Sequence, residues 1–221
     1  SIASHQLRTP LTAISGYASM VLENSYGKIL QKTKVPIKNI LTSSERLLQL
    51  VNDLLNLSRI ESGKIEIKFS KTSLDELISG IISELDVKAK EKGLYVKLKD
   101  GLKPLPKLTL DQDKIRQAIL NLIDNAIKYT DKGGVMIELN NENGKLKILV
   151  SDTGAGIEKE EIGRLFESFS RGAAGNKFWA NGSGLGLYVA KKFVEINGGR
   201  IWAESPGRGK GSNFYIELPI K

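Results

Sequence analysis

The sequence contains no cysteine and only one histidine, His5, among its 221 residues. The absence of cysteine excludes a disulfide framework and a thiolate zinc site. A single imidazole excludes zinc sites built on several histidines, and a Ser-His-Asp triad would have to use His5 itself. No apolar run approaches the roughly 18–20 residues that a membrane span needs, and no signal peptide is visible.

The composition is otherwise that of an ordinary globular protein. Hydrophobic residues make up 40% and charged residues 26% of the chain, which excludes a disordered or collagen-like protein. The length allows one or two domains. The net charge of +8 permits anionic partners, but nine basic and five acidic residues lie in 1–70, and 24 and 20 lie in 71–221. Because this excess is spread evenly, it does not favour a nucleic-acid-binding protein.

Two heptad patterns near the N-terminus predict a pair of long helices. The first has apolar residues spaced alternately four and three apart, namely Leu7, Leu11, Ile14, Ala18 and Val21. The second follows a break at Tyr26-Gly27 and contains Ile37, Ile40, Ser44, Leu47, Val51 and Leu54, flanked by Leu41, Leu48 and Leu55. Such wide apolar stripes cannot be buried within one hairpin. We therefore expect two chains to form a four-helix bundle through residues 1–60; packing against the chain's own second domain is the alternative.

After Ser62-Gly63 the pattern changes to alternating strands and helices. Helices are predicted from a cap at Thr72 or Ser73 to Glu91 and over 111–129, 158–166 and 185–196. Strands are predicted over 64–70, 95–99, 107–110, 135–139, 145–150, 200–204 and 213–218, with a hairpin at Asn143-Gly144. We therefore predict an α/β sandwich over 71–221, with helices on one face of a mixed sheet, after a helical hairpin over 1–70.

His5 is predicted to lie on the solvent side of the first helix, at heptad position b, one turn before Thr9. Pro10 lies within the same helix, removes the hydrogen bond to the carbonyl of Gln6 and is expected to bend the helix near His5. An exposed imidazole is largely neutral at pH 7 and therefore nucleophilic. A solvated histidine without a function is the alternative.

The segment NLIDNAIKYT places three polar residues on one face of an otherwise apolar helix. Asn121, Asn125 and Lys128 are spaced four and three residues apart. Amide oxygens can bind magnesium, and an ammonium group can meet a phosphate. A polar face in contact with solvent is the alternative.

Two glycine-containing segments have the chemistry of a nucleotide site. In DTGAGI, Asp152 ends a strand and can accept a hydrogen bond from an exocyclic amine, while Gly154 and Gly156 allow close backbone approach. The segment GSGLGL precedes a helix, where glycines are typical of a phosphate site. Its glycines are Gly182, Gly184 and Gly186. It is neither a Walker loop nor a Rossmann fingerprint, and loops that only connect elements are the alternative for both segments.

Taken together, SHQLRTPL, NLIDNAIKYT, DTGAGI, FESF and GSGLGL occur in this order and resemble the motifs of bacterial sensor histidine kinases. The resemblance spans Ser4 to Pro219. It implies a dimerisation and histidine-phosphotransfer hairpin over 1–70 and a catalytic ATP-binding domain over 71–221. The fold implied for the second domain is the α/β sandwich shared with gyrase, a heat-shock chaperone and a mismatch-repair ATPase.

The resemblance also implies roles for individual residues. His5 would be phosphorylated by ATP, and the phosphoryl group would pass to an aspartate in the receiver domain of a response regulator. Asn125 would hold Mg²⁺ with support from Asn121, and Lys128 would lie near the phosphates. The remaining ATP-binding residues implied, including a lid over 171–183, are Tyr129, Asp152, Gly154, Gly156, Ile157, Phe166, Phe169, Arg171, Gly182, Ser183, Gly184, Leu185 and Gly186.

One residue departs from the family pattern. Gln6 occupies the position directly after the histidine, where the family usually has an acid. Its amide can accept a hydrogen bond but cannot take up a proton, so we expect autophosphorylation to be retained but slower. The alternative is a kinase-impaired ATP-binding dimeric scaffold or a phosphatase-biased sensor. Thr9 matches the position that the family uses to orient water when it dephosphorylates the regulator.

The remaining expectations concern the setting of this chain. The helical pattern already runs at Ile2 without a capping sequence, so we expect the chain to begin inside a helix, as a fragment of a longer sensor. The resemblance implies a cytoplasmic catalytic part, in a sensor that can be membrane-anchored, with no contact of this part with membrane or nucleic acid. A related ATPase or chaperone is disfavoured because those relatives lack a heptad hairpin with a histidine.

Overall fold

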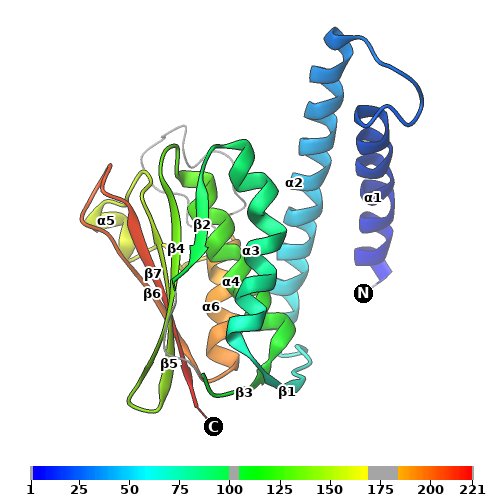
Figure 1. Cartoon of the computed structure of the whole chain (residues 1–221). Coiled ribbons are helices and arrows are strands. Elements are labelled where there is room, and N and C mark those ends of the chain that lie inside the picture. Colours follow the sequence, from blue (N-terminus) through cyan, green and yellow to red (C-terminus); the bar gives the residue numbers. More distant parts are fainter. Residues whose placement is uncertain (1, 100–104, 169–183, 221) are drawn as a thin grey trace. The chain divides into compact units, whose positions relative to one another are not determined.

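A computed structural model describes residues 2–99, 105–168 and 184–220 (Figure 1), with side chains described from Gln6 onward. The chain divides into two compact units, Ser1–Ile65 and Glu66–Lys221. The division lies before the boundary predicted at residue 70, because strand β1 (Phe69–Thr72) pairs with β3 (Leu108–Asp111) of the second unit.

The first unit is a hairpin of two helices, α1 (Ile2–Leu22) and α2 (Gln31–Glu61), which pack against each other. Helix α2 begins at Gln31, ahead of Ile37, the first residue of the predicted heptad. It ends where predicted, because Gly63 adopts φ 65°, a left-handed conformation that suits glycine. Among the described residues, no helix is long and apolar enough to cross a bilayer.

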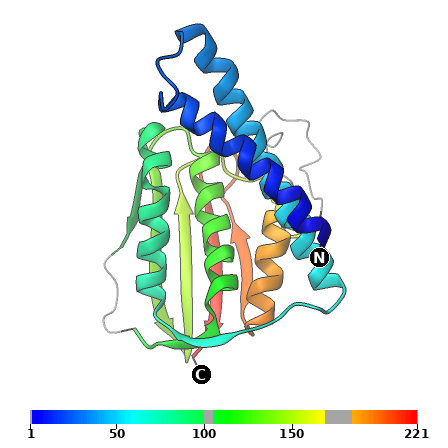
Figure 2. The ribbon, with the colours of Figure 1, turned by 90° about the vertical axis from the view of Figure 1, so that its right-hand side faces the viewer.

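The second unit is the predicted α/β sandwich. Its five-stranded sheet has the order β2-β4-β5-β7-β6, with β2 parallel to β4 and the other pairs antiparallel. The strands are β2 (Tyr95–Leu98), β4 (Gly134–Glu142), β5 (Lys145–Asp152), β6 (Arg200–Glu204) and β7 (Ser212–Pro219). Helices α3 (Leu74–Glu91), α4 (Gln112–Tyr129) and α6 (Gly186–Ile196) lie side by side over one face of this sheet (Figure 2).

Alternation along the strands and periodicity along the helices build one core between the two layers. In β5, Leu146, Ile148 and Val150 are fully buried, whereas the residues between them are not. In α4 the fully buried residues recur at helical spacing and include Ile115, Ile119, Ile123 and Ile127. This buried stripe fixes the rotation of α4 and thereby the direction of its polar face.

Two predicted elements are shorter in the structure by more than one residue. The segment 64–70 forms a strand only from Phe69, because Phe69 pairs with Asp111, the last residue of β3 before α4 begins. The segment 158–166 is α-helical only as α5 (Lys159–Ile162); it is followed by Gly163 and by tight turns through Phe166. Glycine is a poor helix former, which accounts for the early end. The predicted lid over 171–183 lies outside the described residues.

Candidate active site

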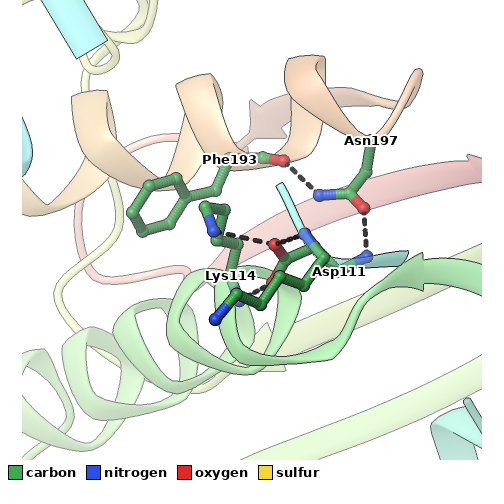
Figure 3. Close-up of polar contacts among 5 residues, drawn as sticks. Asp111, Lys114, Phe193 and Asn197 are labelled. Atoms are coloured by element: carbon green, nitrogen blue, oxygen red, sulfur yellow. Dashed lines mark hydrogen bonds and ion pairs between the residues drawn. The ribbon is translucent and has the colours of Figure 1, made fainter. Parts of the chain in front are cut away.

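Helix α4, which ends within NLIDNAIKYT at Tyr129, is anchored at its N-terminus by a buried polar cluster (Figure 3). Asp111 caps the helix by accepting from the backbone N–H of Lys114 (3.1 Å) and also pairs with the Lys114 ammonium group (2.7 Å). Its own N–H donates to Oδ1 of Asn197 (2.7 Å), whose Nδ2 donates to the Phe193 carbonyl (2.8 Å). The cluster therefore joins the start of α4 to the end of α6. Asn197 directly follows the helix predicted over 185–196 and belongs to none of the motifs.

The Asp111 carboxylate also binds the segment that leads out of the hairpin. Its Oδ2 accepts from the backbone N–H of Lys68 (2.8 Å). Burial by itself would raise the pKa of Asp111, but the hydrogen bonds from Lys114 and Lys68 and the Lys114 charge hold this pKa below its ordinary value of 3.8. The native state therefore favours the ionised carboxylate.

Two hydrogen bonds join α4 to both glycine-containing motifs. Nδ2 of Asn121 donates to the carbonyl of Gly186, at the N-terminus of α6 (3.1 Å). The backbone N–H of Ala155 donates to the carbonyl of Tyr129, at the end of α4 (3.0 Å). The structure thus brings together NLIDNAIKYT, DTGAGI and the described end of GSGLGL, which lie far apart in the sequence.

Asp152 ends β5 with an oriented and partly buried carboxylate. Its Oδ1 accepts from the backbone N–H groups of Gly154 (2.8 Å) and Ser212 (3.2 Å). Within the described part of the chain, no hydrogen bond reaches its Oδ2. Burial raises the pKa of Asp152 above its ordinary value of 3.8, and the two backbone hydrogen bonds oppose this shift. The free oxygen is suited to accept a hydrogen bond from an amino group of a ligand.

The glycines of DTGAGI are needed by the protein's own backbone. A Cβ at Gly154 would overlap the carbonyl oxygen of Tyr129, and a Cβ at Gly156, whose φ is 66°, would overlap that of Gly207. The loop 205–211 closes over this segment, because Gly209 N–H donates to the Ala155 carbonyl (2.6 Å). Our reading of the sequence missed this loop, although the glycine-rich run PGRGKGS could have indicated it.

The other predicted residues of the α4 face are half-buried. Asn125 and Lys128 lie between the buried stripe and solvent. The Lys128 ammonium group lies 5.0 Å from the centre of the Tyr129 ring. Burial raises the pKa of Tyr129 above 10.0, and the charge of Asp124 adds to this shift.

The remaining predicted site residues divide into three groups. Ile157 and Leu185 are buried, while Phe166 and Gly184 are half-buried. Gln6 and Thr9 are exposed on α1, and His5 lies in the same helix, with its side chain outside the described part. The residues that lie outside the described ranges altogether are Phe169, Arg171, Gly182 and Ser183.

The donor atoms present fit a nucleotide with a hard metal ion. No group of three or more histidine, cysteine or acidic side chains in the described part could hold a metal ion. Amide oxygens are the alternative ligands for magnesium. Because Asn121 uses its amide nitrogen toward Gly186, its Oδ1 is the atom left for a ligand.

Comparison with known proteins gives the class. Residues 110–221 match the family model described as histidine kinase-, DNA gyrase B- and HSP90-like ATPase, and residues 1–63 match the His Kinase A (phospho-acceptor) domain. The chain belongs to the sensor histidine kinases, with a phospho-acceptor domain followed by an ATP-binding domain.

Individual relatives support this assignment over nearly the whole chain. The circadian input-output histidine kinase CikA of Synechococcus elongatus is 36% identical over 98% of this chain and 29% of its own length. The sensor histidine kinase WalK of Bacillus subtilis is 35% identical over 99% of this chain and 36% of its own. The crystal structure of full-length ShkA in complex with AMPPNP has 28% identity and a TM-score of 0.77, over 99% of this chain and 44% of that one. The chain thus spans about a third of the length of these two curated relatives.

Proposed function

We propose that this chain catalyses ATP-dependent autophosphorylation of His5 and passes the phosphoryl group to an aspartate in the receiver domain of a response regulator. The observation that carries the proposal is the pair of hydrogen bonds that joins α4 to both glycine motifs, Asn121 to Gly186 and Ala155 to Tyr129. A nucleotide held there would contact three segments that these hydrogen bonds bring together. AMPPNP in the similar ShkA structure supports the same kind of ligand.

The residues present account for the transfer step. A ring nitrogen of His5 attacks the γ-phosphorus of ATP in line; the P–N bond forms as the bond to the bridging oxygen breaks, and ADP leaves. Asp152 accepts a hydrogen bond from the exocyclic amine through Oδ2, and Lys128 approaches the phosphates. Asn125, with Asn121, would hold Mg²⁺, whose charge would neutralise that of the phosphates. Positioning and charge neutralisation are most of what phosphoryl transfer requires.

The hairpin supplies the acceptor histidine and, we propose, the homodimer contact. Leu7, Ile14, Leu47 and Leu54 are all exposed in the single chain although they occupy the predicted seam. A second copy, docked through residues 1–60, buries this stripe in a four-helix bundle. We assign the phospho-acceptor role to the hairpin, residues 1–70 as predicted, and the catalytic role to 71–221. This part of the protein would act in the cytoplasm, where ATP and the regulator are found.

The test is incubation with γ-labelled ATP and Mg²⁺, followed by mapping of the label. We expect an acid-labile, base-stable phosphate that His5→Ala abolishes while nucleotide binding is retained. Label that persists in His5→Ala, or that is acid-stable, contradicts the proposal. Absence of label from the unchanged chain, with nucleotide bound, would favour the scaffold alternative.

Gln6 is expected to limit the rate of this reaction. It is exposed on α1 directly after His5 and cannot act as a base. General-base catalysis contributes roughly 10²–10⁴-fold, so Gln6→Glu should raise the autophosphorylation rate by about tenfold or more. Gln6→Ala is the matched control. No gain with Gln6→Glu would show that a carboxylate is not needed at this position.

Thr9 supports a second activity of the same helix. It lies one turn after His5 and is exposed. We propose that its hydroxyl orients water for dephosphorylation of the regulator. Thr9→Ala should therefore weaken phosphatase activity and spare autophosphorylation, and equal loss of both activities would count against this role.

A further inference from the structure

A lysine from α3 caps the end of α4 that carries the nucleotide residues. Helix α3 ends at Glu91, and Lys92 is its C-cap residue, followed by Gly93 at φ 69°. The Lys92 ammonium group donates to the backbone carbonyls of Ile127 (2.8 Å), Lys128 (2.9 Å) and Thr130 (3.0 Å). One side chain therefore satisfies three carbonyls at the C-terminus of a neighbouring helix.

The carbonyls that Lys92 contacts lie at the C-terminus of α4, where helical hydrogen bonding ends. The last four carbonyls of an α-helix have no partner within the helix, and they carry the negative end of its dipole. Thr130 ends α4 in an extended conformation, at φ −104° and ψ 127°. A left-handed glycine cap is thus absent at this position, and the Lys92 ammonium group takes its place. Its positive charge also complements the dipole.

The capped turn is in direct contact with the proposed adenine-binding loop. The carbonyl of Tyr129, between the Lys128 and Thr130 carbonyls, accepts from Ala155 N–H (3.0 Å). Ala155 lies within DTGAGI, three residues after Asp152. A displacement of the α4 end would therefore move Lys128, Tyr129 and the loop that orients Asp152 together.

We propose that Lys92 is a positioning residue for nucleotide binding. It acts through the backbone of 127–130, which it holds in the geometry that presents Lys128 and Tyr129 and that supports the Asp152 loop. This inference rests on the proposed nucleotide site and assigns a role to a residue outside every motif that the sequence resemblance identified. It does not require Lys92 to touch the nucleotide.

The test compares three variants of the full chain. Lys92→Met keeps the aliphatic stem and removes the donors, and Lys92→Arg keeps a charged donor. Lys90→Met is the matched control, because Lys90 lies on the same helix but pairs with Asp86, one turn away on α3 itself (2.5 Å). Each is measured for the Kd of a non-hydrolysable ATP analogue, for kcat and KM of autophosphorylation, and for backbone hydrogen exchange without nucleotide.

For Lys92→Met we expect Kd and KM to rise about three- to tenfold, as a helix-dipole contact in a partly buried site would give. The value of kcat should change less than about twofold, since the reacting groups are intact. Exchange should accelerate at Ala155 and residues 127–130, while Lys90→Met leaves all values unchanged and Lys92→Arg restores most of the affinity.

Three results would overturn the inference. Unchanged Kd in Lys92→Met shows that the contact does not position the site. An equal rise in Lys90→Met shows a general charge effect. Faster exchange throughout the second unit shows a structural role only. Failure of the proposed function is distinguishable, because the unchanged chain would then either bind no nucleotide or bind it without any label appearing on His5.

Discussion

The two units of this chain differ in how far they bury their apolar side chains. In the α/β unit, apolar side chains from strands and helices meet in one closed core, with Ile119, Ile123 and Val150 fully buried. In the hairpin, only Ala18 and Leu57 are buried among the described apolar residues, whereas Leu47 and Leu54 are 46% and 55% exposed. The hairpin thus leaves an apolar stripe exposed in the single chain, whereas the α/β unit encloses its own core.

The largest expected effect comes from placing a charge on the open stripe of the hairpin. In the proposed dimer, Leu47→Asp buries two carboxylates, and each unpaired buried charge costs about 3–5 kcal/mol. We expect the chain to become monomeric at all concentrations in analytical ultracentrifugation. The matched control is Val87→Asp, since Val87 is 67% exposed on α3 of the other unit.

This substitution should leave the second unit folded. Trp202 lies in β6 and stacks on Tyr215, so its fluorescence reports unfolding of that unit. Dimers that persist in Leu47→Asp, or loss of dimers in Val87→Asp, would show that the stripe is not the contact between copies.

The next effect concerns the closed core. Ile123 is fully buried on α4, so Ile123→Ala should lower the free energy of unfolding of the second unit by about 2–5 kcal/mol. Denaturant unfolding followed by tryptophan fluorescence measures the change. Val87→Ala is the control and should stay within about 0.5 kcal/mol. A similar loss in both variants would mean that the core is not closed as described.

A smaller effect is expected at Asp111, which holds the segment that follows the hairpin through the backbone of Lys68. Asp111→Asn keeps an acceptor oxygen but loses the ion pair with Lys114, so we expect a loss of about 1–2 kcal/mol at neutral pH. Because the pKa of Asp111 is lowered in the native state, its contribution is complete above the unfolded pKa and is lost as the pH falls through the folded pKa.

The difference in unfolding free energy between the unchanged chain and Asp111→Asn should therefore shrink below about pH 4. Denaturant unfolding at a series of pH values measures it, with the exposed Asp113→Asn as control. A difference that does not vary with pH would remove the ionised carboxylate from the explanation.

Much of this architecture could be predicted because the spacing of apolar residues shows which side of a helix or strand is buried. The heptads predicted both hairpin helices, and a reading of alternation and helical spacing predicted the main elements of the sandwich. The same signal failed at 64–70, where Ile65, Ile67 and Phe69 alternate but only Phe69 has a strand partner. Alternation is a property of one segment, whereas a strand must also pair with a neighbouring strand. The pattern in 64–70 does not indicate how long that neighbouring strand is.

The candidate site was predictable only in part, for a related physical reason. Residues such as Asn121 and Asp152 belong to local motifs, which hydrogen bonds bring together in the structure. Lys92, Ser212 and Asn197 act through long-range contacts with backbone or carboxylate groups. Such contacts depend on which segments meet in three dimensions, and no local spacing encodes them.

The smallest expected change in stability is that of Asp152→Asn, and its sign is opposite to that of Asp111→Asn. This difference distinguishes a carboxylate proposed to bind the nucleotide from one that stabilises the fold. Burial raises the pKa of Asp152, so its ionised form destabilises the native state at neutral pH. The stabilising contribution of Asp152 is therefore complete below the pKa that it has in the unfolded chain, and it is lost as the pH rises through its pKa in the folded chain. Asp152→Asn should therefore slightly stabilise the second unit at neutral pH, whereas Asp111→Asn destabilises it.

The same substitution should weaken nucleotide binding. The amide introduced by Asp152→Asn presents a neutral acceptor in place of a carboxylate, and we expect the Kd of a non-hydrolysable ATP analogue to rise about three- to tenfold at neutral pH. As the pH falls, the unchanged chain should lose its higher affinity over Asp152→Asn. This loss should occur at a pH above the ordinary pKa of aspartate, because the raised pKa of Asp152 means that its carboxylate is protonated at a higher pH. An Asp152→Asn variant that loses stability and keeps its affinity would make Asp152 a structural residue like Asp111.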